Sequence, residues 1–531
     1  MPPRRVLITV VVCTVLMGLA RVAAEHVDRA AANIATLVLG FIAFMTALVW
    51  FARSSGYPAM TRRMVPLALL GAVIITSALF RIEEVSGNLI PVVKFRWTPS
   101  ADKLLSGPVV DGSLPEVDLA SDTEGDFPEF LGPGRTASVE RPLLERDWSA
   151  SPPKVLWRRP IGAGWSAFSA VNGFAVTMEQ RGDDELVTCY DIATGDLRWS
   201  HAEKTRHESI MGGIGPRSTP TIHKGRVYAL GATGRLVCLD GATGKLIWKF
   251  DLLSELKLTP EKDMAGVAWG RANSPLIVDD KVIVPMGGPL VGPSSDSPPK
   301  FVSLVALDRK TGEKAWSGGE SQVSYSSPVE FTLAGRRQIV IVNEATVAGH
   351  DPTTGRELWS HPWPGGSASS ASASQPRFLA DDQLLLSKAY GTGAAVIRIV
   401  GDGGDKLKVE KVWENNRVLK TKLANVTTYQ GHAYGLSDGI LECVDLATGK
   451  SKWKRGRYEH GQLLRVGDCL LVLSEAGELL LIDASPEGHR ELGKIPLIEG
   501  KTWNNLCMFG SILLARNGQE MVAVELQVRT P

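Results

Sequence analysis

Several charged and aromatic residues in the C-terminal three quarters of the chain are of types that contact small ligands or partner proteins. They stand next to short apolar runs, where strands are expected to begin: Glu179, Gln180, Arg181, Arg217, Trp269, Tyr325, Gln375 and Trp503. Arg217 follows Gly-Ile-Gly-Pro, which brings the backbone close to a ligand or to a neighbouring element. We expect Arg217 and Trp269 to contact a ligand or partner, with strand packing as the alternative role for every residue of this set.

Other kinds of chemistry have no sequence support. The chain has no Cys-x-x-Cys pair, no His-Glu-x-x-His, no Gly-x-Ser-x-Gly and no phosphate-binding P-loop motif, so metal, hydrolase and nucleotide sites are not indicated. The formal net charge is +1, and no basic run occurs outside the apolar N-terminal region. Nucleic-acid binding would require a basic stripe or patch, so we predict none.

The elements that position these residues repeat along the chain. The pattern Asp-x-x-Thr-Gly-x-x-x-Trp occurs five times: Asp191, Thr194, Gly195 and Trp199; Asp240, Thr243, Gly244 and Trp248; Asp308, Thr311, Gly312 and Trp316; Asp351, Thr354, Gly355 and Trp359; Asp445, Thr448, Gly449 and Trp453. In each copy the Asp can accept backbone N–H groups of a turn, and the Gly can supply a positive φ where the chain reverses. The Trp then falls on the outgoing strand and can fill the space between neighbouring sheets. A period of about 40 to 50 residues predicts the blades of a β-propeller.

Counting the repeats predicts an all-β, eight-bladed propeller of four-stranded antiparallel blades. Trp413 marks a degenerate copy between Trp359 and Trp453, and Asp483 marks another that lacks both Thr-Gly and Trp. The last run, 503–526, supplies three strands, and the strand 155–160 can pair with them and close the ring without free edges. Seven blades are the alternative.

Cysteine usage predicts free, buried thiols. Cys189, Cys238 and Cys443 each stand two residues before the repeat Asp, in three different blades, and are therefore too far apart for disulfides.

Residues 1–96 differ from the rest and predict about three transmembrane helices, over the apolar stretches 6–20, 34–52 and 65–80. The first stretch is alternatively a cleaved signal peptide. Residues 97–126 are rich in Ser, Pro, Gly, Asp and Glu and predict a flexible linker, which leaves 127–531 as the propeller. Arginines before the first stretch and between the second and third favour a cytoplasmic N-terminus. We therefore expect a multi-pass protein of a bacterial cytoplasmic membrane, with its propeller facing the periplasm or cell exterior.

The repeats resemble those of the pyrroloquinoline-quinone (PQQ) repeat family of β-propellers, which includes quinoprotein alcohol dehydrogenases and the assembly factor BamB. The segment Phe127-Pro128-Glu129-Phe130-Leu131-Gly132-Pro133 is also similar to the lead-in of bacterial PQQ-like propeller proteins. The resemblance implies that the repeat residues are structural. It also implies that a dehydrogenase would have two adjacent cysteines, which this chain lacks, together with a Ca²⁺ site and an Asp base. Glu179, Asn273 and Asp183 are candidates for those roles by residue type only.

Together these observations lead to one main expectation and two alternatives. The main expectation is a membrane-anchored, non-catalytic propeller that binds a protein or peptide, in a scaffold or assembly role at the cell envelope, with no catalytic residue, metal or bound cofactor. One alternative is a sensor that binds a small molecule or carbohydrate at the central channel. The other is a PQQ-dependent dehydrogenase with Ca²⁺.

Overall fold

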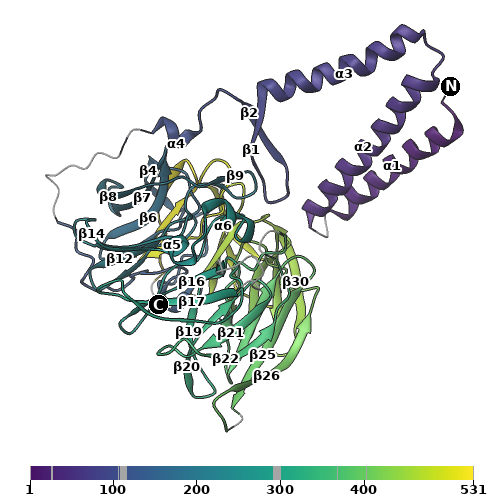
Figure 1. Cartoon of the computed structure of the whole chain (residues 1–531). Coiled ribbons are helices and arrows are strands. Elements are labelled where there is room, and N and C mark those ends of the chain that lie inside the picture. The colour runs from purple at the N-terminus through teal and green to yellow at the C-terminus, as the bar shows by residue number, and fades with distance from the viewer. Residues whose placement is uncertain are drawn as a thin grey trace. The chain divides into compact units, whose positions relative to one another are not determined.

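The computed structural model describes residues 2–24, 28–105, 107, 116–290, 300–366, 369–401 and 403–529. The chain divides into two compact units, Met1–Pro99 and Ser100–Pro531 (Figure 1). Part of the predicted linker, at 106 and 108–115, lies outside the described residues.

The first unit contains three apolar helices followed by a hairpin. The helices are α1 (Arg4–Ala23), α2 (Arg29–Ser54) and α3 (Ala59–Leu79), and the hairpin strands are β1 (Phe80–Val85) and β2 (Pro91–Phe95). All three helices are long and apolar enough to cross a membrane, as the hydropathy pattern predicts. Their side chains face outward almost throughout, which is the arrangement expected of helices solvated by lipid.

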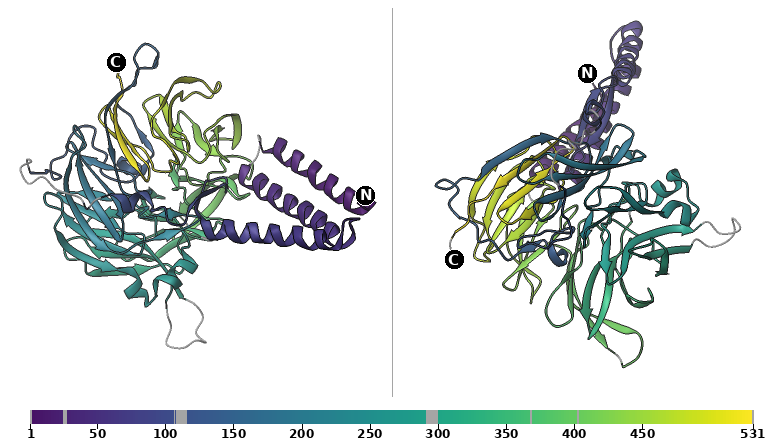
Figure 2. Two further views of the ribbon diagram at one scale, coloured as in Figure 1. Left: turned by 90° about the horizontal axis from the view of Figure 1, so that it is seen from above. Right: turned by 90° about the vertical axis from the view of Figure 1, so that its left-hand side faces the viewer.

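The second unit is a propeller of eight sheets, each a blade whose strands run from the innermost to the outermost (Figure 2). Blades 1 to 4 consist of β5 (Ser169–Val171), β6 (Phe174–Arg181), β7 (Asp184–Asp191) and β8 (Leu197–Lys204); β11 (Thr221–His223), β12 (Arg226–Leu230), β13 (Arg235–Asp240) and β14 (Leu246–Asp251); β15 (Leu276–Val278), β16 (Lys281–Leu290), β17 (Lys300–Asp308) and β18 (Lys314–Gly318); β19 (Val329–Leu333), β20 (Arg336–Val342), β21 (Thr346–His350) and β22 (Glu357–Pro362). Blades 5 to 8 consist of β23 (Arg377–Phe378), β24 (Gln383–Lys388), β25 (Gly393–Gly401) and β26 (Leu407–Asn415); β27 (Thr427–Tyr429), β28 (His432–Ser437), β29 (Ile440–Asp445) and β30 (Lys450–Arg457); β31 (Gln462–Val466), β32 (Cys469–Leu473), β33 (Glu478–Asp483) and β34 (Glu491–Pro496); β35 (Cys507–Phe509), β36 (Ile512–Arg516), β37 (Glu520–Glu525) and β4 (Lys154–Pro160).

Short elements outside the blades complete the unit. They are α4 (Ala101–Leu104), the 3₁₀ turn η1 (Pro133–Arg135), β3 (Ser138–Val139), the hairpin β9 (Glu208–Ser209) and β10 (Gly213–Ile214), and two helices between blades 2 and 3, α5 (Leu252–Leu256) and α6 (Pro260–Gly266). Strand β4 supplies the outermost strand of blade 8, with Trp157 opposite Ala523. The prediction of eight four-stranded blades is confirmed, and the strand before the first blade closes the ring.

The repeat motif forms the turn between the two outer strands of a blade. In blade 4, Asp351 Oδ1 accepts N–H groups from Thr353 at 3.0 Å and from Thr354 at 2.8 Å, and Gly355 has a φ of 74°. The glycine also lies against the tryptophan of the preceding blade: a Cβ on Gly355 would stand 2.4 Å from Trp316 Cε3. The motif therefore selects Gly for two reasons, the backbone conformation and the close approach of a neighbouring ring.

In most blades, the tryptophan of the outermost strand is hydrogen-bonded to the following blade. The indole Nε1 of Trp199 donates to Gly241 O at 2.8 Å, and that of Trp316 donates to Pro352 O at 3.1 Å, so each ring is fixed to a carbonyl of the following blade. Trp359 is different, because its Nε1 donates to Gln338 Oε1 of its own blade at 2.5 Å. Blade 5 lacks the motif, so no equivalent motif turn meets Trp359 there.

The lead-in segment 127–139 lies inside the ring of innermost strands. Phe127 pairs with Ala170 of blade 1, and Pro128 O accepts the N–H of Ile222 in blade 2. The buried Arg135 donates to Ser274 O at 3.1 Å in blade 3 and to Pro328 O at 3.0 Å beside blade 4. β3 then runs parallel to β31 of blade 7. One short segment thus contacts the inner strands, or the residues directly before them, of five blades.

The six cysteines are free and buried, as predicted. Burial raises the pKa of Cys189 well above its usual value of 9.0, so this thiol stays protonated and packs as a small apolar group.

Candidate functional site

The two faces of the propeller are built from different connections. Turns of the repeat motif lie on one face. The opposite face, which we call the upper face, carries the connections that lead from the outermost strand of one blade to the innermost strand of the next. Because ligands of rigid scaffolds usually meet such loops, the upper face is where a site is expected.

A belt of hydrogen bonds links the starts of successive innermost strands on this face. Thr219 N donates to Ser274 Oγ at 2.9 Å, and Ser274 N donates to Ser327 Oγ at 2.8 Å. Each of these residues stands two positions before the innermost strand of its blade. Gln375 and Asn425 stand at the equivalent positions of blades 5 and 6, and Gln375 N donates to Asn425 Oδ1 at 2.8 Å. The belt fixes the backbone from which the site residues project.

The fourth residue before the innermost strand is aromatic or cationic in five blades. Four of these residues are Trp503 in blade 8, Trp165 in blade 1, Arg217 in blade 2 and Tyr325 in blade 4. The fifth, Tyr458 in blade 7, donates its hydroxyl to Glu491 of its own blade at 2.7 Å. In blade 3 that position is Ala272, and Trp269 from the same connection packs on Tyr325 instead. Trp503, Trp165, Arg217, Trp269 and Tyr325 together form what we call the aromatic arc, which spans five consecutive blades.

Ring contacts and hydrogen bonds connect the members of the aromatic arc. The ring centroids of Trp165 and Trp503 are 5.0 Å apart, and those of Trp269 and Tyr325 are also 5.0 Å apart with 15° between the planes. Trp165 Nε1 donates to Gly212 O at 2.6 Å. Arg217 Nη2 donates to the same carbonyl at 2.7 Å, so these side chains converge on one loop.

A lysine lies over the first ring pair. The Nζ of Lys501 is 4.9 Å from the centroid of Trp165 and 4.3 Å from that of Trp503. Such cation–π contacts hold a positive charge beside flat aromatic surfaces. Both tryptophans are only partly buried, whereas the indole Nε1 of Trp503 is buried and has no hydrogen-bond partner among the described residues. This corner combines a cation, two ring faces and an unused donor.

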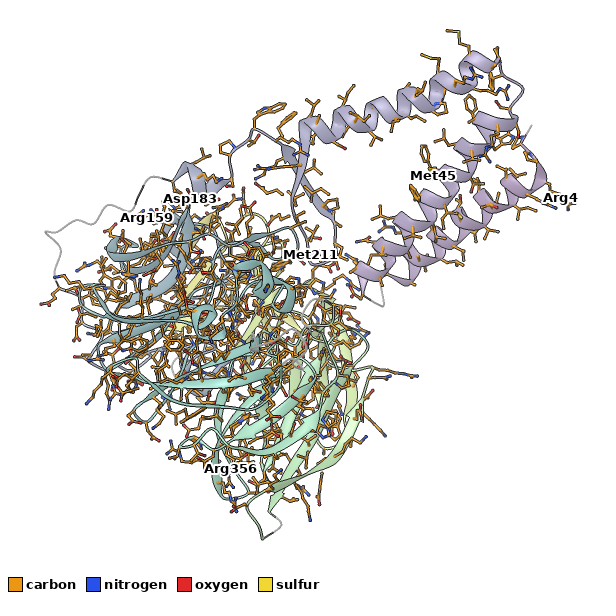
Figure 3. The ribbon with its side chains drawn as sticks, in the orientation of Figure 1. Arg4, Met45, Arg159, Asp183, Met211 and Arg356 are labelled. Atoms are coloured by element: carbon orange, nitrogen blue, oxygen red, sulfur yellow. The ribbon has the colours of Figure 1, made fainter. Side chains whose placement is uncertain are left out.

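Arg217, Trp269 and Tyr325, which the sequence predicts as contact residues, are brought together by the fold. Arg217 also donates to Gly213 O at 2.9 Å and to Gly215 O, so its guanidinium fixes the backbone of the β9–β10 hairpin. Burial lowers the pKa of Arg217 to about 10, which leaves it charged at neutral pH. The same loop carries Met211, which is exposed at its turn (Figure 3).

Glu179, Gln180 and Arg181 lie elsewhere, where blade 8 meets blade 1. Glu179 Oε1 accepts the Tyr190 hydroxyl at 2.6 Å and an Arg181 N–H at 3.2 Å. Burial raises the pKa of Glu179, but the charges of Arg181 and Arg516 and the hydrogen bonds outweigh it and lower the pKa overall. Gln180 Nε2 donates to Thr205 O at 2.9 Å. These hydrogen-bond partners all belong to blade 1 or to the connection that follows it, so the contacts indicate packing within this part of the propeller.

The residues that could serve a metal-dependent dehydrogenase are not assembled into a metal site. Glu179 is enclosed by its own partners, and Asp183 is exposed on the turn between β6 and β7 (Figure 3). Asn273 belongs to blade 3, where its Nδ2 donates to Ser326 O at 2.7 Å while its buried Oδ1 has no partner among the described residues. Within the described part of the chain, no three His, Cys, Asp or Glu side chains group closely enough to hold a metal ion.

One buried carboxyl on the upper face has an unusual proton affinity. Glu185 is the second residue of β7, and its Oε2 accepts the N–H of Ala232 in blade 2 at 3.0 Å. Burial raises the pKa of Glu185 to about 7, although this hydrogen bond and the charge of Arg217 lower it. At neutral pH it is therefore close to half protonated.

The predicted linker reaches the upper face at one point. Asp102 in α4 is buried, and its Oδ2 accepts from Arg206 Nη1 at 2.7 Å. Arg206 also donates to Gly182 O at 2.6 Å, so the loops of blade 1 and the linker meet at this arginine.

Sequence inspection missed Trp165, Lys501 and Glu185. Trp165 and Trp503 stand at equivalent positions, four residues before an innermost strand, and that shared spacing was a usable signal once strand starts were known. Lys501 and Glu185 have no sequence signal of this kind, because their place in the site depends on contacts between blades.

Comparison with known proteins finds a family model and several curated proteins that are similar to parts of this sequence. A family model described as "Outer membrane protein assembly factor BamB" matches residues 183–455. The sequence is 28% identical over 162 residues to the 1-butanol dehydrogenase (quinone) of Thauera butanivorans, and 30% identical over 155 residues to the quinohemoprotein alcohol dehydrogenase ADH-IIG of Pseudomonas putida. These matches cover 28% and 27% of this chain but only 23% and 19% of the relatives, about a fifth of their length.

Solved structures share the fold at low sequence identity. A europium-containing methanol dehydrogenase has a TM-score of 0.57 and 11% identity, over 76% of this chain and 98% of its own. The quinohemoprotein alcohol dehydrogenase of Comamonas testosteroni has a TM-score of 0.53 and 13% identity, over 78% of this chain and 82% of its own.

The comparisons correct two expectations. The prediction of a non-catalytic scaffold that binds a protein or peptide is wrong, since the curated proteins that the sequence matches are alcohol dehydrogenases. The prediction of no cofactor is wrong for the same reason, since the curated relatives are named as quinone-linked or quinohemoprotein alcohol dehydrogenases. Both predictions relied on missing motifs, and the repeat itself does not separate scaffolds from dehydrogenases.

Proposed function

We propose a function from one premise: the chain belongs to the PQQ-like β-propeller family described by the outer membrane protein assembly factor BamB. Its proposed activity is that of a membrane-anchored quinoprotein dehydrogenase, in which the upper face binds a PQQ-type quinone and oxidises a small alcohol. The matches to quinone-linked alcohol dehydrogenases support this class of reaction. The observation that carries the proposal is the Trp165–Trp503 ring pair beneath Lys501.

The aromatic arc fits the organic part of such a cofactor. PQQ is planar and carries several carboxylates, so it requires flat apolar surfaces, cations and hydrogen-bond donors. Trp165 and Trp503 would provide the surfaces and Lys501 the charge. When bound, PQQ supplies the two-electron acceptor for alcohol oxidation.

The described residues do not fit the metal that accompanies PQQ in such enzymes. A hard cation such as Ca²⁺ needs about six oxygen ligands, and the described part of the chain offers no cluster of carboxylates. We therefore assign no role to a metal. Within the proposal, Glu185 is the group that can accept a proton near neutral pH, because burial raises its pKa to about 7.

The membrane region supports an anchoring role and a direction. Three helices could cross the bilayer, and arginines stand in the first turn of α1, at the end of α2 and in the first turns of α3. This bias supports a cytoplasmic N-terminus and, within the proposal, a propeller outside the cytoplasm. A reporter that is active only in the cytoplasm, fused after Pro531, should give no signal; a strong signal would contradict this orientation.

Direct binding of PQQ tests the proposal. The full-length protein in detergent is titrated with PQQ, with and without Ca²⁺ or a lanthanide, and tryptophan emission is followed. We expect saturable quenching with a Kd of about 1 μM or lower, near −8 kcal/mol. Lys501→Met should weaken binding by about tenfold or more, since a buried charge-assisted contact contributes roughly 1.5–3 kcal/mol. Lys249→Met, at an exposed lysine of β14, should leave it unchanged. Non-saturable quenching, or equal loss in both variants, would contradict the proposed site.

A further inference from the structure

The hairpin that follows α3 has one apolar face and one charged face. Phe80 pairs with Phe95 and Ile82 with Val93 across the two strands, and Trp97 stacks on Phe95 with centroids 5.3 Å apart. We call these five residues the apolar hairpin face. Four of them are largely exposed, including Val93 at 53% and Trp97 at 67%.

The other face is occupied by paired charges. Arg81 is opposite Lys94, and both approach Glu83, with Lys94 Nζ at 2.6 Å and Arg81 Nη2 at 3.6 Å from its oxygens. Because successive residues of a strand point to opposite sides, the charges lie on the side opposite the apolar hairpin face, where Val92 is the one exposed large apolar residue of β2. An isolated two-stranded hairpin is marginally stable in water, so the apolar face needs a covering surface.

The two ends of the hairpin are tied to the ends of the helices. β1 begins directly after Leu79, the last residue of α3, and Arg96 donates to Ser77 O at 2.8 Å near that end. At the hairpin tip, Asn88 O accepts from Asn33 Nδ2 at 2.8 Å, in the first turns of α2. Arg21 near the end of α1 donates to Asn33 Oδ1 at 2.7 Å. The hairpin therefore runs between the end of α3 and the α1–α2 junction.

These ties decide what covers the apolar hairpin face. Three successive crossings put the end of α1, the start of α2 and the end of α3 on the same side of a membrane. A hairpin tied to all three lies at the level where the lipid headgroups meet the acyl chains. Tryptophan and phenylalanine next to paired charges are the side chains that this interface favours.

We infer that the β1–β2 hairpin is a membrane-surface element, with Phe80, Ile82, Val93, Phe95 and Trp97 inserted at the interfacial level of the bilayer and Arg81, Glu83 and Lys94 facing water. The occupant of the apolar face is the lipid of the membrane that α1 to α3 cross. The inference goes beyond the proposed activity and rests only on the anchoring of the three helices. By lying along the surface, the hairpin would fix the point from which the segment toward the propeller departs.

Adjacent residues on opposite faces give a matched test. Val93→Cys and Lys94→Cys are each labelled with an environment-sensitive fluorophore in the full-length protein reconstituted in phosphatidylcholine vesicles. All six native cysteines are buried, and the unsubstituted chain is the labelling control. We expect the probe at 93 to be quenched several-fold more than the probe at 94 by a quencher attached near the top of the acyl chains. Iodide in the aqueous phase should show the opposite order.

Two outcomes would overturn the inference. Equal quenching of both probes by iodide would mean that both faces are in water. A probe at 93 that is shielded from both lipid and iodide would mean that protein covers the face instead. Ile82→Cys and Arg81→Cys repeat the comparison on the other strand, in case a substitution in β2 disturbs the hairpin. Retention of the protein in carbonate-washed vesicles separately tests the anchoring, and PQQ binding does not enter this experiment.

Discussion

Two glycines in blade 4 allow the packing role of the repeat motif to be separated from its backbone role. Gly355 in the motif has a φ of 74°, and Gly335 in the turn between β19 and β20 has a φ of 72°. A Cβ on Gly335 would meet no atom within 4 Å, whereas one on Gly355 would stand 2.4 Å from Trp316 Cε3. The Trp316 ring is fixed by its hydrogen bond to Pro352 O, so it has little freedom to withdraw.

The expected effect follows from these differences. Substitution by Ala costs about 1–2 kcal/mol at either position because of the left-handed backbone, partly offset by the less flexible unfolded chain. Gly355→Ala adds an overlap with a buried ring, which costs roughly 1–3 kcal/mol more. At about 2 °C per kcal/mol for a large domain, Gly355→Ala should lower the thermal midpoint by some 2–6 °C more than Gly335→Ala.

Thermal unfolding of the full-length protein in detergent, followed by tryptophan emission, measures both shifts. Trp316→Leu combined with Gly355→Ala should recover part of the loss, because the smaller side chain leaves room for the added methyl group. Equal midpoints for the two single variants would refute the reasoning. In that case the motif would require glycine for its φ alone, and the contact between blades would contribute nothing measurable.

Two further predictions concern buried charges. Arg135→Ala should destabilise the propeller by about 3–5 kcal/mol, since it leaves Glu129 and several inner carbonyls without their partner. The control Arg356→Ala, at an exposed arginine labelled in Figure 3, should change the free energy of unfolding by less than about 0.5 kcal/mol. Similar urea midpoints for the two variants would contradict the role of the lead-in segment. Glu185→Gln tests the pH dependence of stability. The pKa of Glu185 in the folded state, about 7, exceeds the usual 4.5, so between these pH values the folded state holds a proton that the unfolded state does not. The free energy of unfolding of the wild-type protein should therefore fall by roughly 3 kcal/mol as the pH rises from 4.5 to 7. The variant keeps an acceptor for Ala232 N and should lose less over that range, so parallel stability curves for the two proteins would exclude a raised pKa.

The propeller was predictable because its signals are local. Each copy of the motif, such as Asp191, Gly195 and Trp199, indicates a turn and an outgoing strand within nine residues, and five such copies define the period. Counting to eight required one further step, the pairing of 155–160 with the last strands, and the strand register, with Trp157 opposite Ala523, confirms it. The three apolar helices were likewise visible from composition.

The site was only partly predictable because its contacts cross blades. Arg217, Trp269 and Tyr325 were identified from their positions near strand starts, and the fold brings them together. Glu179 and Arg181 have the same sequence signal, yet their partners are Tyr190 and each other. The lead-in 127–139 has no periodicity that indicates its place among the inner strands, since its partners lie up to about 330 residues away.

Alcohol-dependent electron transfer by the PQQ-loaded protein tests the proposed function most directly. The full-length chain, loaded with PQQ, with and without Ca²⁺ or a lanthanide, is assayed with 1-butanol and an artificial two-electron acceptor. The proposal predicts reduction of the acceptor that requires both PQQ and alcohol and is lost in Lys501→Met under sub-saturating PQQ. Saturable PQQ binding without any turnover over a panel of small alcohols would contradict the dehydrogenase activity, and absence of binding would contradict the site itself.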